Sequence, residues 1–208
     1  MKIALLLVTL FFSAAAACHP HSFIAMKAEL KSQNDRLTGI KMVWTMDEIT
    51  SADLLYDAGQ ASPGDVVWKK LAAQVMANVL GQHYFTELWQ EKTRIKFLNL
   101  PQEYNLSRSG HKAVLEFIVP LGEPQPLAGK RYRMLTFDPS YFVDMQYETS
   151  QDIAMDENLK AHCQLKLTTP QPDASLQQYA LSLDKADAPP EDMDLGRQFA
   201  QTVTLICR

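Results

Sequence analysis

Two segments near the start of the chain alternate strictly between apolar and polar residues, a pattern that favours β-strands over helices. One face of the first segment carries Ile24, Met26, Ala28 and Leu30, and one face of the second carries Ile40, Met42, Trp44 and Met46. Turn-forming residues at 32–35 separate the two segments. The pattern therefore predicts a β-hairpin with one buried face.

Helices are expected after the hairpin, and further strands after the helices. Thr50 can cap a short helix that ends near Gly59, and Ser62 with Asp65 predicts a capping box for a longer helix that stops at Gly81. Strands are then expected at residues 94–98, 112–119, 131–137, 141–148, 161–168 and 202–207, with a short helix at 176–183. The predicted fold is a single α+β domain, mainly antiparallel, with two or three inserted helices.

The overall charge argues against partners that carry many phosphates. Among 208 residues, 20 are Lys or Arg and 24 are Asp or Glu, so the formal net charge is −4. Binding to nucleic acid usually relies on a basic surplus, which this chain lacks. Hydrophobic residues make up 47% and charged residues 21%, which is typical of a globular protein and excludes a disordered chain.

The first residues have the features of a secretory signal peptide. Lys2 supplies the positive charge, residues 3–12 form a short apolar core, and residues 13–17 are small. We therefore expect a signal peptide at residues 1–18 and a periplasmic domain at residues 19–208. A lipoprotein anchored at Cys18 is disfavoured, because such a signal needs an aliphatic residue three positions earlier and Ala15 stands there. Ordinary cleavage is expected before or just after Cys18.

Two further cysteines are expected to form a disulfide. Cys163 and Cys207 each lie in a strand-like segment, and an oxidising compartment allows them to pair. A bridge between them would close a loop of about 45 residues and would stabilise the fold by roughly 4 kcal/mol. The alternative is a pair of buried free thiols.

The predicted mature chain begins with two histidines that flank a proline. His19 and His21 could ligate a borderline-soft metal ion in a metal-accessible compartment. Pro20 has no amide hydrogen, so a square-planar amino-terminal copper or nickel clamp is excluded if His19 comes first. Zinc needs three or four ligands, so other ligands must come from elsewhere in the fold. The remaining histidines stand alone and are interpreted as surface or core residues; they are His83, His111 and His162.

The order of several motifs resembles one known family. Residues 19–23 read His-Pro-His-Ser-Phe, residues 44–48 read Trp-Thr-Met-Asp-Glu, and residues 83–86 read His-Tyr-Phe-Thr. Residues 138–142 then read Asp-Pro-Ser-Tyr-Phe, and a final strand ends at Cys207. Across essentially all of the predicted mature chain, this order resembles the ZevA-like family. That family has no known function and is labelled the periplasmic component of an uncharacterised ABC-type transport system.

The resemblance implies a role in handling metal ions. Members of the family are typically encoded beside nickel/cobalt-type permeases of the NicO class and are implicated in acquiring zinc or related metals. The resemblance points to His19 and His21, with Asp138 and the acidic pair Asp47 and Glu48, as metal ligands. Zinc is the expected metal, with nickel or cobalt as alternatives. The other interpretation of the three acidic residues is ordinary turn formation and helix capping.

Three functional hypotheses follow from the sequence. The leading one is a non-enzymatic, periplasmic metal-binding accessory protein that serves a membrane metal permease of the NicO class. The second is a metal-dependent hydrolase, although the sequence has no His-Glu-x-x-His helix, no Gly-x-Ser-x-Gly elbow and no glycine-rich phosphate loop. The third is a structural interaction module of the cell envelope that binds no metal.

Overall fold

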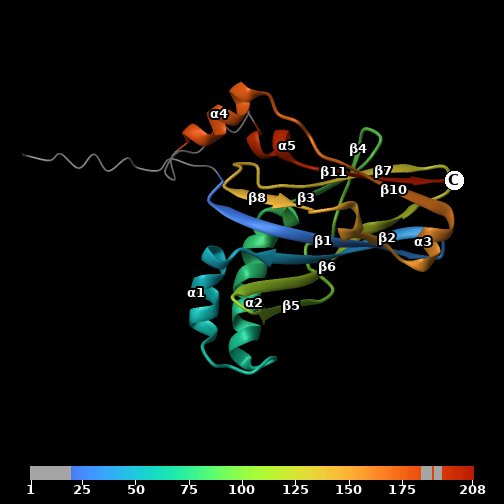
Figure 1. Ribbon diagram of the computed structural model, residues 1–208. Coiled ribbons are helices and arrows are strands. Elements are labelled where there is room, and N and C mark those ends of the chain that lie inside the picture. Colours follow the sequence, from blue (N-terminus) through green and yellow to red (C-terminus); the bar gives the residue numbers. More distant parts are fainter. Residues whose placement is uncertain (1–19, 184–188, 190–193) are drawn as a thin grey trace, which may run out of the picture.

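Figure 1 shows the computed structural model, which describes residues 20–183, 189 and 194–208. The predicted signal peptide, Cys18 and His19 lie outside the described residues. The described chain is a mixed α+β structure in which two sheets share one core. This confirms the predicted α+β domain, with its mainly antiparallel sheets.

The predicted hairpin forms the centre of the first sheet. Strand β1 (Ser22–Gln33) pairs antiparallel with β2 (Arg36–Met46), from Ile24 opposite Met46 to Gln33 opposite Arg36. The two connecting residues, Asn34 and Asp35, both have positive φ angles of 51° and 57°. Tight hairpin turns need this backbone conformation, and Asn and Asp tolerate it better than most residues.

The first sheet is completed on both sides of this hairpin. Its order is β5-β6-β2-β1-β8, in which β5 is Tyr104–Ser109, β6 is Lys112–Pro126 and β8 is Val143–Gln146. Strand β9 (Ile153–Met155) also pairs with β1, farther along it. Both β8 and β9 run parallel to β1, so this sheet is mixed.

The second sheet is antiparallel throughout. Its order is β10 (Cys163–Thr168), β11 (Thr202–Cys207), β7 (Arg131–Thr136), β3 (Thr86–Gln90) and β4 (Thr93–Ile95). Strand β11, the last in the chain, has the bounds that its sequence pattern predicts. Strands β3, β5 and β9 were not anticipated, because their short segments carry no clear alternation.

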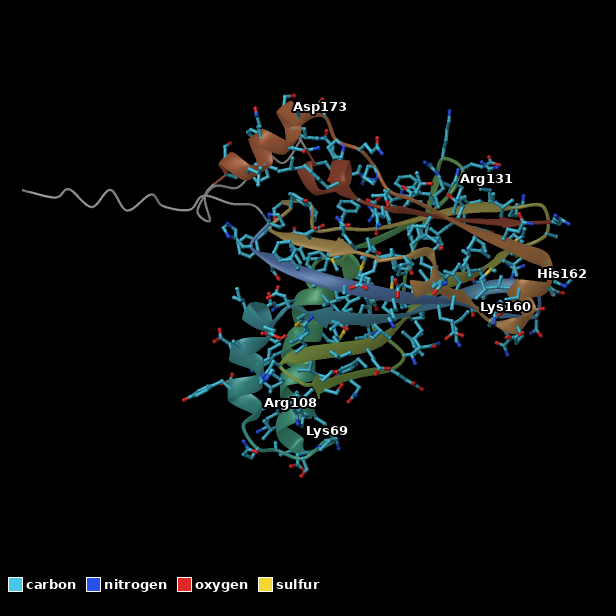
Figure 2. All side chains as sticks on the ribbon, in the orientation of Figure 1. Lys69, Arg108, Arg131, Lys160, His162 and Asp173 are labelled. Carbon is cyan, nitrogen blue, oxygen red and sulfur yellow. A yellow bond between two sulfur atoms is a disulfide. The ribbon has the colours of Figure 1, made fainter. Side chains whose placement is uncertain are left out.

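Two helices are inserted between β2 and β3, as expected. They are α1 (Glu48–Ala58) and α2 (Val66–Gly81), which lie side by side in Figure 1. The cap of α1 is Asp47 rather than Thr50, and α2 begins three residues later than the pattern suggests. Ser62 forms a turn with Asp65 instead, and its amide donates to the Asp65 carboxylate at 2.8 Å. Arg108, labelled in Figure 2, donates to the carbonyl oxygens of Leu55 and Gly59 at the end of α1.

Shorter helical segments lie in the second half of the chain. They are α3 (Glu157–His162), α4 (Ala174–Ser182) and α5 (Leu195–Phe199), together with the 3-10 turns η1 (His83–Phe85) and η2 (Ser150–Asp152). Figure 1 shows α4 and α5 on the opposite side of the strands from α1 and α2. The last two residues of α3, Ala161 and His162, lie where the sequence pattern predicts the beginning of the strand over residues 161–168.

The core joins both sheets and the two inserted helices. Trp44 of β2 is fully buried and meets the ring of Phe117 of β6 edge-on, with a centroid distance of 4.8 Å. Trp68 and Met76 of α2 belong to the same cluster, as does Tyr132 of β7. Burying this apolar surface is the main stabilising contribution to the fold.

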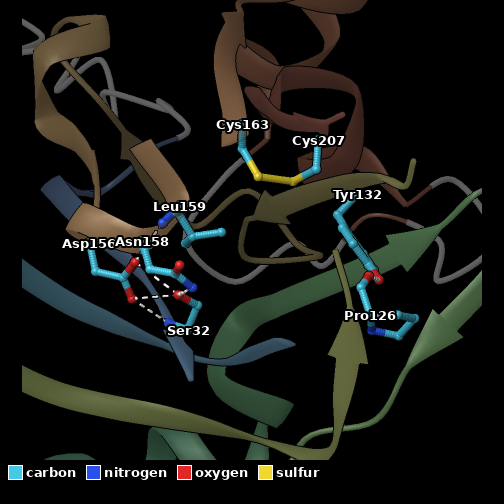
Figure 3. The surroundings of a disulfide bond; sticks show 8 residues. All are labelled: Ser32, Pro126, Tyr132, Asp156, Asn158, Leu159, Cys163 and Cys207. Carbon is cyan, nitrogen blue, oxygen red and sulfur yellow. Dashed lines mark hydrogen bonds between the residues drawn. A yellow bond between two sulfur atoms is a disulfide. The ribbon is translucent and has the colours of Figure 1, made fainter. Parts of the chain in front are cut away.

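Cys163 and Cys207 form a disulfide in the structure (Figure 3). They are partners in register, at the beginning of β10 and the end of β11. Beside them, the Asp156 carboxylate accepts hydrogen bonds from the Ser32 hydroxyl of β1 and from the Leu159 amide of α3. Helix α3 therefore links the far end of β1 to the edge of the second sheet.

Candidate functional site

Three of the motifs singled out in the sequence meet at the start of β1. The amide of His21 donates to the carbonyl oxygen of Phe142 at 2.9 Å. On the other side, the amide of Asp47 donates to the carbonyl oxygen of Phe23 at 2.9 Å, and the Asp47 carboxylate accepts from the Phe23 amide at 2.7 Å. We call the group formed by His21, Asp47, Asp138 and Phe142 the β1-start site.

His21 is held here by both its backbone and its ring. The side chain is partly buried, and its ring lies 5.0 Å from the ring of Phe142 at an angle of 42°. Phe142 also accepts a second backbone hydrogen bond, from the amide of Ser22 at 3.3 Å. The backbone that leads into β1 is therefore fixed against the loop that follows β7. The other predicted ligand in this motif, His19, lies outside the described residues.

Asp47 fastens α1 to β1. Its carboxylate accepts from the Thr50 amide at 2.8 Å and the Thr50 hydroxyl at 2.7 Å, in addition to the Phe23 amide. Partial burial by itself raises the pKa of Asp47, but the hydrogen bonds from Thr50 and Phe23 outweigh it and hold the pKa below its usual value. Both oxygens are thus engaged in capping and in strand attachment. Glu48 is exposed, as the first residue of α1.

Asp138 organises the loop between β7 and β8. Its carboxylate accepts hydrogen bonds from the amide and hydroxyl of Ser140, at 2.9 to 3.1 Å, and from the amide of Val143 at 3.0 Å. Its carbonyl oxygen accepts from the amide of Tyr141, which has a positive φ of 58°. These bonds fold the loop so that Phe142 faces His21.

Helix α5 packs directly against this loop. The Gly196 amide donates to the Pro139 carbonyl oxygen at 3.0 Å, and a Cβ atom on Gly196 would lie only 1.7 Å from the carbonyl oxygen of Asp138. The rings of Tyr141 and Phe199 stack with their centroids 4.0 Å apart. The position of the loop is therefore fixed by close contact as well as by hydrogen bonds.

The structure thus brings His21, Asp47 and Asp138 to one end of the first sheet, with Glu48 beside them on α1. Within the described ranges, no group of three or more His, Cys, Asp or Glu side chains is arranged to hold a metal ion. The carboxylates of Asp47 and Asp138 accept backbone hydrogen bonds that hold α1 and the loop after β7 in place. Of the predicted ligands that the structure describes here, His21 supplies an imidazole, a ligand type that zinc commonly takes.

Asp144 is a half-buried carboxyl group near this site that is not among the predicted ligands. It is the second residue of β8 and pairs in register with Phe23 of β1. Burial raises the pKa of Asp144, and the hydrogen bonds from the Gln146 side chain, at 3.0 and 3.2 Å, only partly offset this effect. The alternation of residues 143–147 could have placed Asp144 and Gln146 on one face of a strand, but it does not indicate burial.

The η1 turn contains the His-Tyr-Phe motif of residues 83–85, but the sequence did not predict its backbone conformation. His83, Tyr84 and Phe85 have φ angles of 49°, 61° and 49°, a left-handed conformation that costs roughly 1–2 kcal/mol for each non-glycine residue. Phe85 also accepts a hydrogen bond from the amide of Phe137, which precedes Asp138. A strained turn of this kind persists only where surrounding contacts hold it.

Comparison with known proteins places the chain among relatives of unknown function. An uncharacterized protein from Haemophilus influenzae (strain ATCC 51907 / DSM 11121 / KW20 / Rd) is 36% identical over 208 residues, which cover the whole of both chains. No solved structure matches the chain. Within the described residues, no helix is long and apolar enough to cross a membrane. Residues 4–207 match the family described as "Protein of unknown function (DUF1007)", and the chain belongs to that family.

Proposed function

We propose that the protein is a non-enzymatic periplasmic accessory that binds a divalent metal ion as cargo through His19 and His21. Zinc is the expected ion, with nickel or cobalt as alternatives, and the proposed recipient is a membrane permease of the NicO class. The observation that carries the proposal is that three motifs meet at the start of β1, where His21 is fixed by the Asp138 loop and by Phe142.

The proposed ligands are imidazoles, with the acidic residues in supporting positions. Neutral imidazole is a common zinc ligand, and side chains at positions i and i+2 of an extended segment project to the same side. Cleavage after Cys18 would expose the α-amine of His19 as a third donor. Asp47 and Asp138 act as positioning residues, because their carboxylates hold the segment that carries His21.

The recipient is inferred from the motif resemblance, and the position of the site supports it. Phe23 follows the two histidines and has 52% of its surface exposed, although it is a large apolar residue. An apolar side chain beside the cargo site offers a contact for a partner protein. The start of β1 is therefore the part of the surface where we expect the permease to dock.

The metal-binding part of the proposal is tested by calorimetry and native mass spectrometry on exported protein. Wild-type protein should bind one zinc ion per chain, and the double variant His19→Ala/His21→Ala should bind none. The matched control, His111→Ala/His162→Ala, removes two exposed histidines and should bind zinc as the wild type does; His162 lies on α3, at the other end of β1 (Figure 2). One-to-one binding that survives in the first double variant would overturn the proposed site.

The transport part needs a separate measurement. A strain whose chromosomal gene carries His19→Ala/His21→Ala should accumulate less zinc under zinc limitation than a strain that carries the control variant. Equal zinc accumulation in the two strains, at equal protein levels, would contradict the role in delivery even if the site binds metal.

A further inference from the structure

A cavity of about 800 Å³ opens where the end of α2, the η1 turn and the segment after β4 come together. Its apolar lining includes Leu80, Ile95 and Leu98, and its basic lining consists of His83, Arg94 and Lys96. The volume falls within the range of pockets that hold small organic ligands. It shares no residue with the β1-start site.

Tyr84 lines the cavity and is only 2% exposed. Its hydroxyl donates to the carbonyl oxygen of Leu98 at 2.8 Å, and its ring meets that of Phe97 edge-on at 6.0 Å. The hydrogen bond joins the η1 turn to the segment after β4, and both line the cavity. The cavity is therefore held open by buried contacts, which favours binding without rearrangement.

The charged side chains that line the cavity are basic. Among the residues that the structure describes, no Asp or Glu lines the cavity, although the chain as a whole carries a formal charge of −4. Arg94 lies 3.5 Å from a Glu87 oxygen, but its side chain remains 49% exposed. Glu87 accepts two shorter hydrogen bonds from Arg197, so its charge is already largely compensated. Lys96 forms no ion pair with any described residue.

Exposed apolar residues continue from the cavity along the same segment. Leu98 is 49% exposed and Leu100 is 72% exposed, so both can contact a bound apolar group. A ligand that fits this surface needs an anionic group for Arg94 and Lys96 and an apolar chain for the leucines. Neither a compact inorganic anion nor a neutral lipid meets both conditions.

We propose that this cavity binds a single-chain amphipathic carboxylate of the fatty-acid type, taken up as a free molecule. The carboxylate lies between Arg94 and Lys96, and the hydrocarbon chain covers Leu80, Ile95 and Leu98. Hydrogen bonds between a guanidinium group and a carboxylate are among the stronger polar contacts in proteins. The chain adds the burial of apolar surface.

The test uses decanoate as the probe and measures amide shifts and affinity by NMR titration of the exported protein. Decanoate should shift the amides of Leu80, Ile95 and Leu98, and Arg94→Gln/Lys96→Gln should weaken its binding by about tenfold or more. The matched control is Lys69→Gln/Lys70→Gln, which removes two exposed charges from α2 (Figure 2) and should leave the affinity unchanged. All four positions are exposed, and thermal unfolding checks that each variant is folded.

Two further probes separate the other occupants. Octyl glucoside, a neutral amphiphile, should bind about tenfold more weakly than decanoate, because it offers nothing to the two cations. Equal binding of the glucoside, or equal decanoate affinity in the Arg94/Lys96 variant, would overturn the proposal. Binding to phosphatidylglycerol vesicles without any response to free decanoate would also overturn it and would assign the surface to a membrane.

Discussion

Arg197 of α5 donates two hydrogen bonds to the carboxylate of Glu87 on β3, at 2.8 and 2.7 Å, although 110 residues separate them in the chain. The Glu87 side chain is only 9% exposed, and it also accepts from the Trp89 indole at 2.8 Å. Arg197 bonds to Asp194 as well and lies over the ring of Phe137. One guanidinium group thus ties α5 to the second sheet, close to the Asp138 loop.

Removing this guanidinium group should destabilise the protein clearly. Arg197→Met would leave the Glu87 carboxylate buried without its main partner, a change that typically costs roughly 3–5 kcal/mol. We expect the lower end of that range, because the Arg197 side chain is 37% exposed. Urea denaturation measures the effect. Lys160→Met breaks an exposed ion pair with Glu157 and should leave the denaturation midpoint unchanged. A midpoint in Arg197→Met equal to that of wild type would contradict the proposed contribution.

The same pair should make stability depend on acid pH. Burial alone raises the pKa of Glu87, but the hydrogen bonds and charge of Arg197, with help from Trp89 and Arg94, hold it below its ordinary value of 4.5. The unfolded chain therefore binds this proton more readily, so the contribution is full above about pH 4.5 and is lost as pH falls through the folded-state pKa. Free energies of unfolding measured between neutral and acid pH should fall more steeply for wild type than for Glu87→Gln. Parallel curves for the two proteins would rule out this linkage.

Asp138 should affect metal binding through the position of its loop. Asp138→Ala removes the acceptor for the Ser140 and Val143 amides, at a cost of about 1–3 kcal/mol. The protein should still fold, while zinc affinity falls and the amide signals of His21 and Phe142 shift. Asp57→Ala, an exposed acidic position on α1, should change neither readout. Unchanged zinc affinity in folded Asp138→Ala would limit Asp138 to shaping the loop.

Gly196 should tolerate no side chain. In Gly196→Ala the new Cβ atom would meet the Asp138 carbonyl oxygen at 1.7 Å, and backbone atoms have little room to move. Displacing α5 should cost about 2–3 kcal/mol. Gly81→Ala is the control, because nothing lies within 4 Å of the new Cβ atom at the end of α2. Thermal unfolding should separate the two variants by several degrees, and equal melting temperatures would disprove the close packing of α5.

Alternation predicted the strands that have one buried face, and capping residues predicted α1 and α2, although the caps in the structure are Asp47 and Asp65 rather than Thr50 and Ser62. The pattern of residues 24–46 led to β1 and β2, and β11 was placed at Thr202–Cys207. Short strands such as β3 have too few residues to show a period. Parallel pairing of β1 with β8 depends on contacts across about 120 residues, for which local patterns carry no information.

The candidate site was predicted as a group of motifs, but the roles of its acidic residues were not separable from sequence. Asp47 and Asp138 precede a helix and a turn, where a carboxylate can either cap the backbone or bind an ion. The choice depends on which amides lie opposite each oxygen. The Phe23 amide reaches Asp47 from another strand, and the Val143 amide reaches Asp138 only once the loop has folded back. Zinc binding by His19 and His21 stays a prediction.

The position of β1 inside its sheet has a consequence for the order of assembly. One edge of β1 can pair with β2 as soon as the hairpin has formed, but the other edge is covered by β8 and β9, which lie more than a hundred residues later. While the chain emerges, that edge presents unpaired backbone groups to any neighbouring strand. Folding that waits for such distant segments is slow and open to aggregation. A nascent chain of this protein should therefore gain from a chaperone that shields β1 until residues 143–155 arrive.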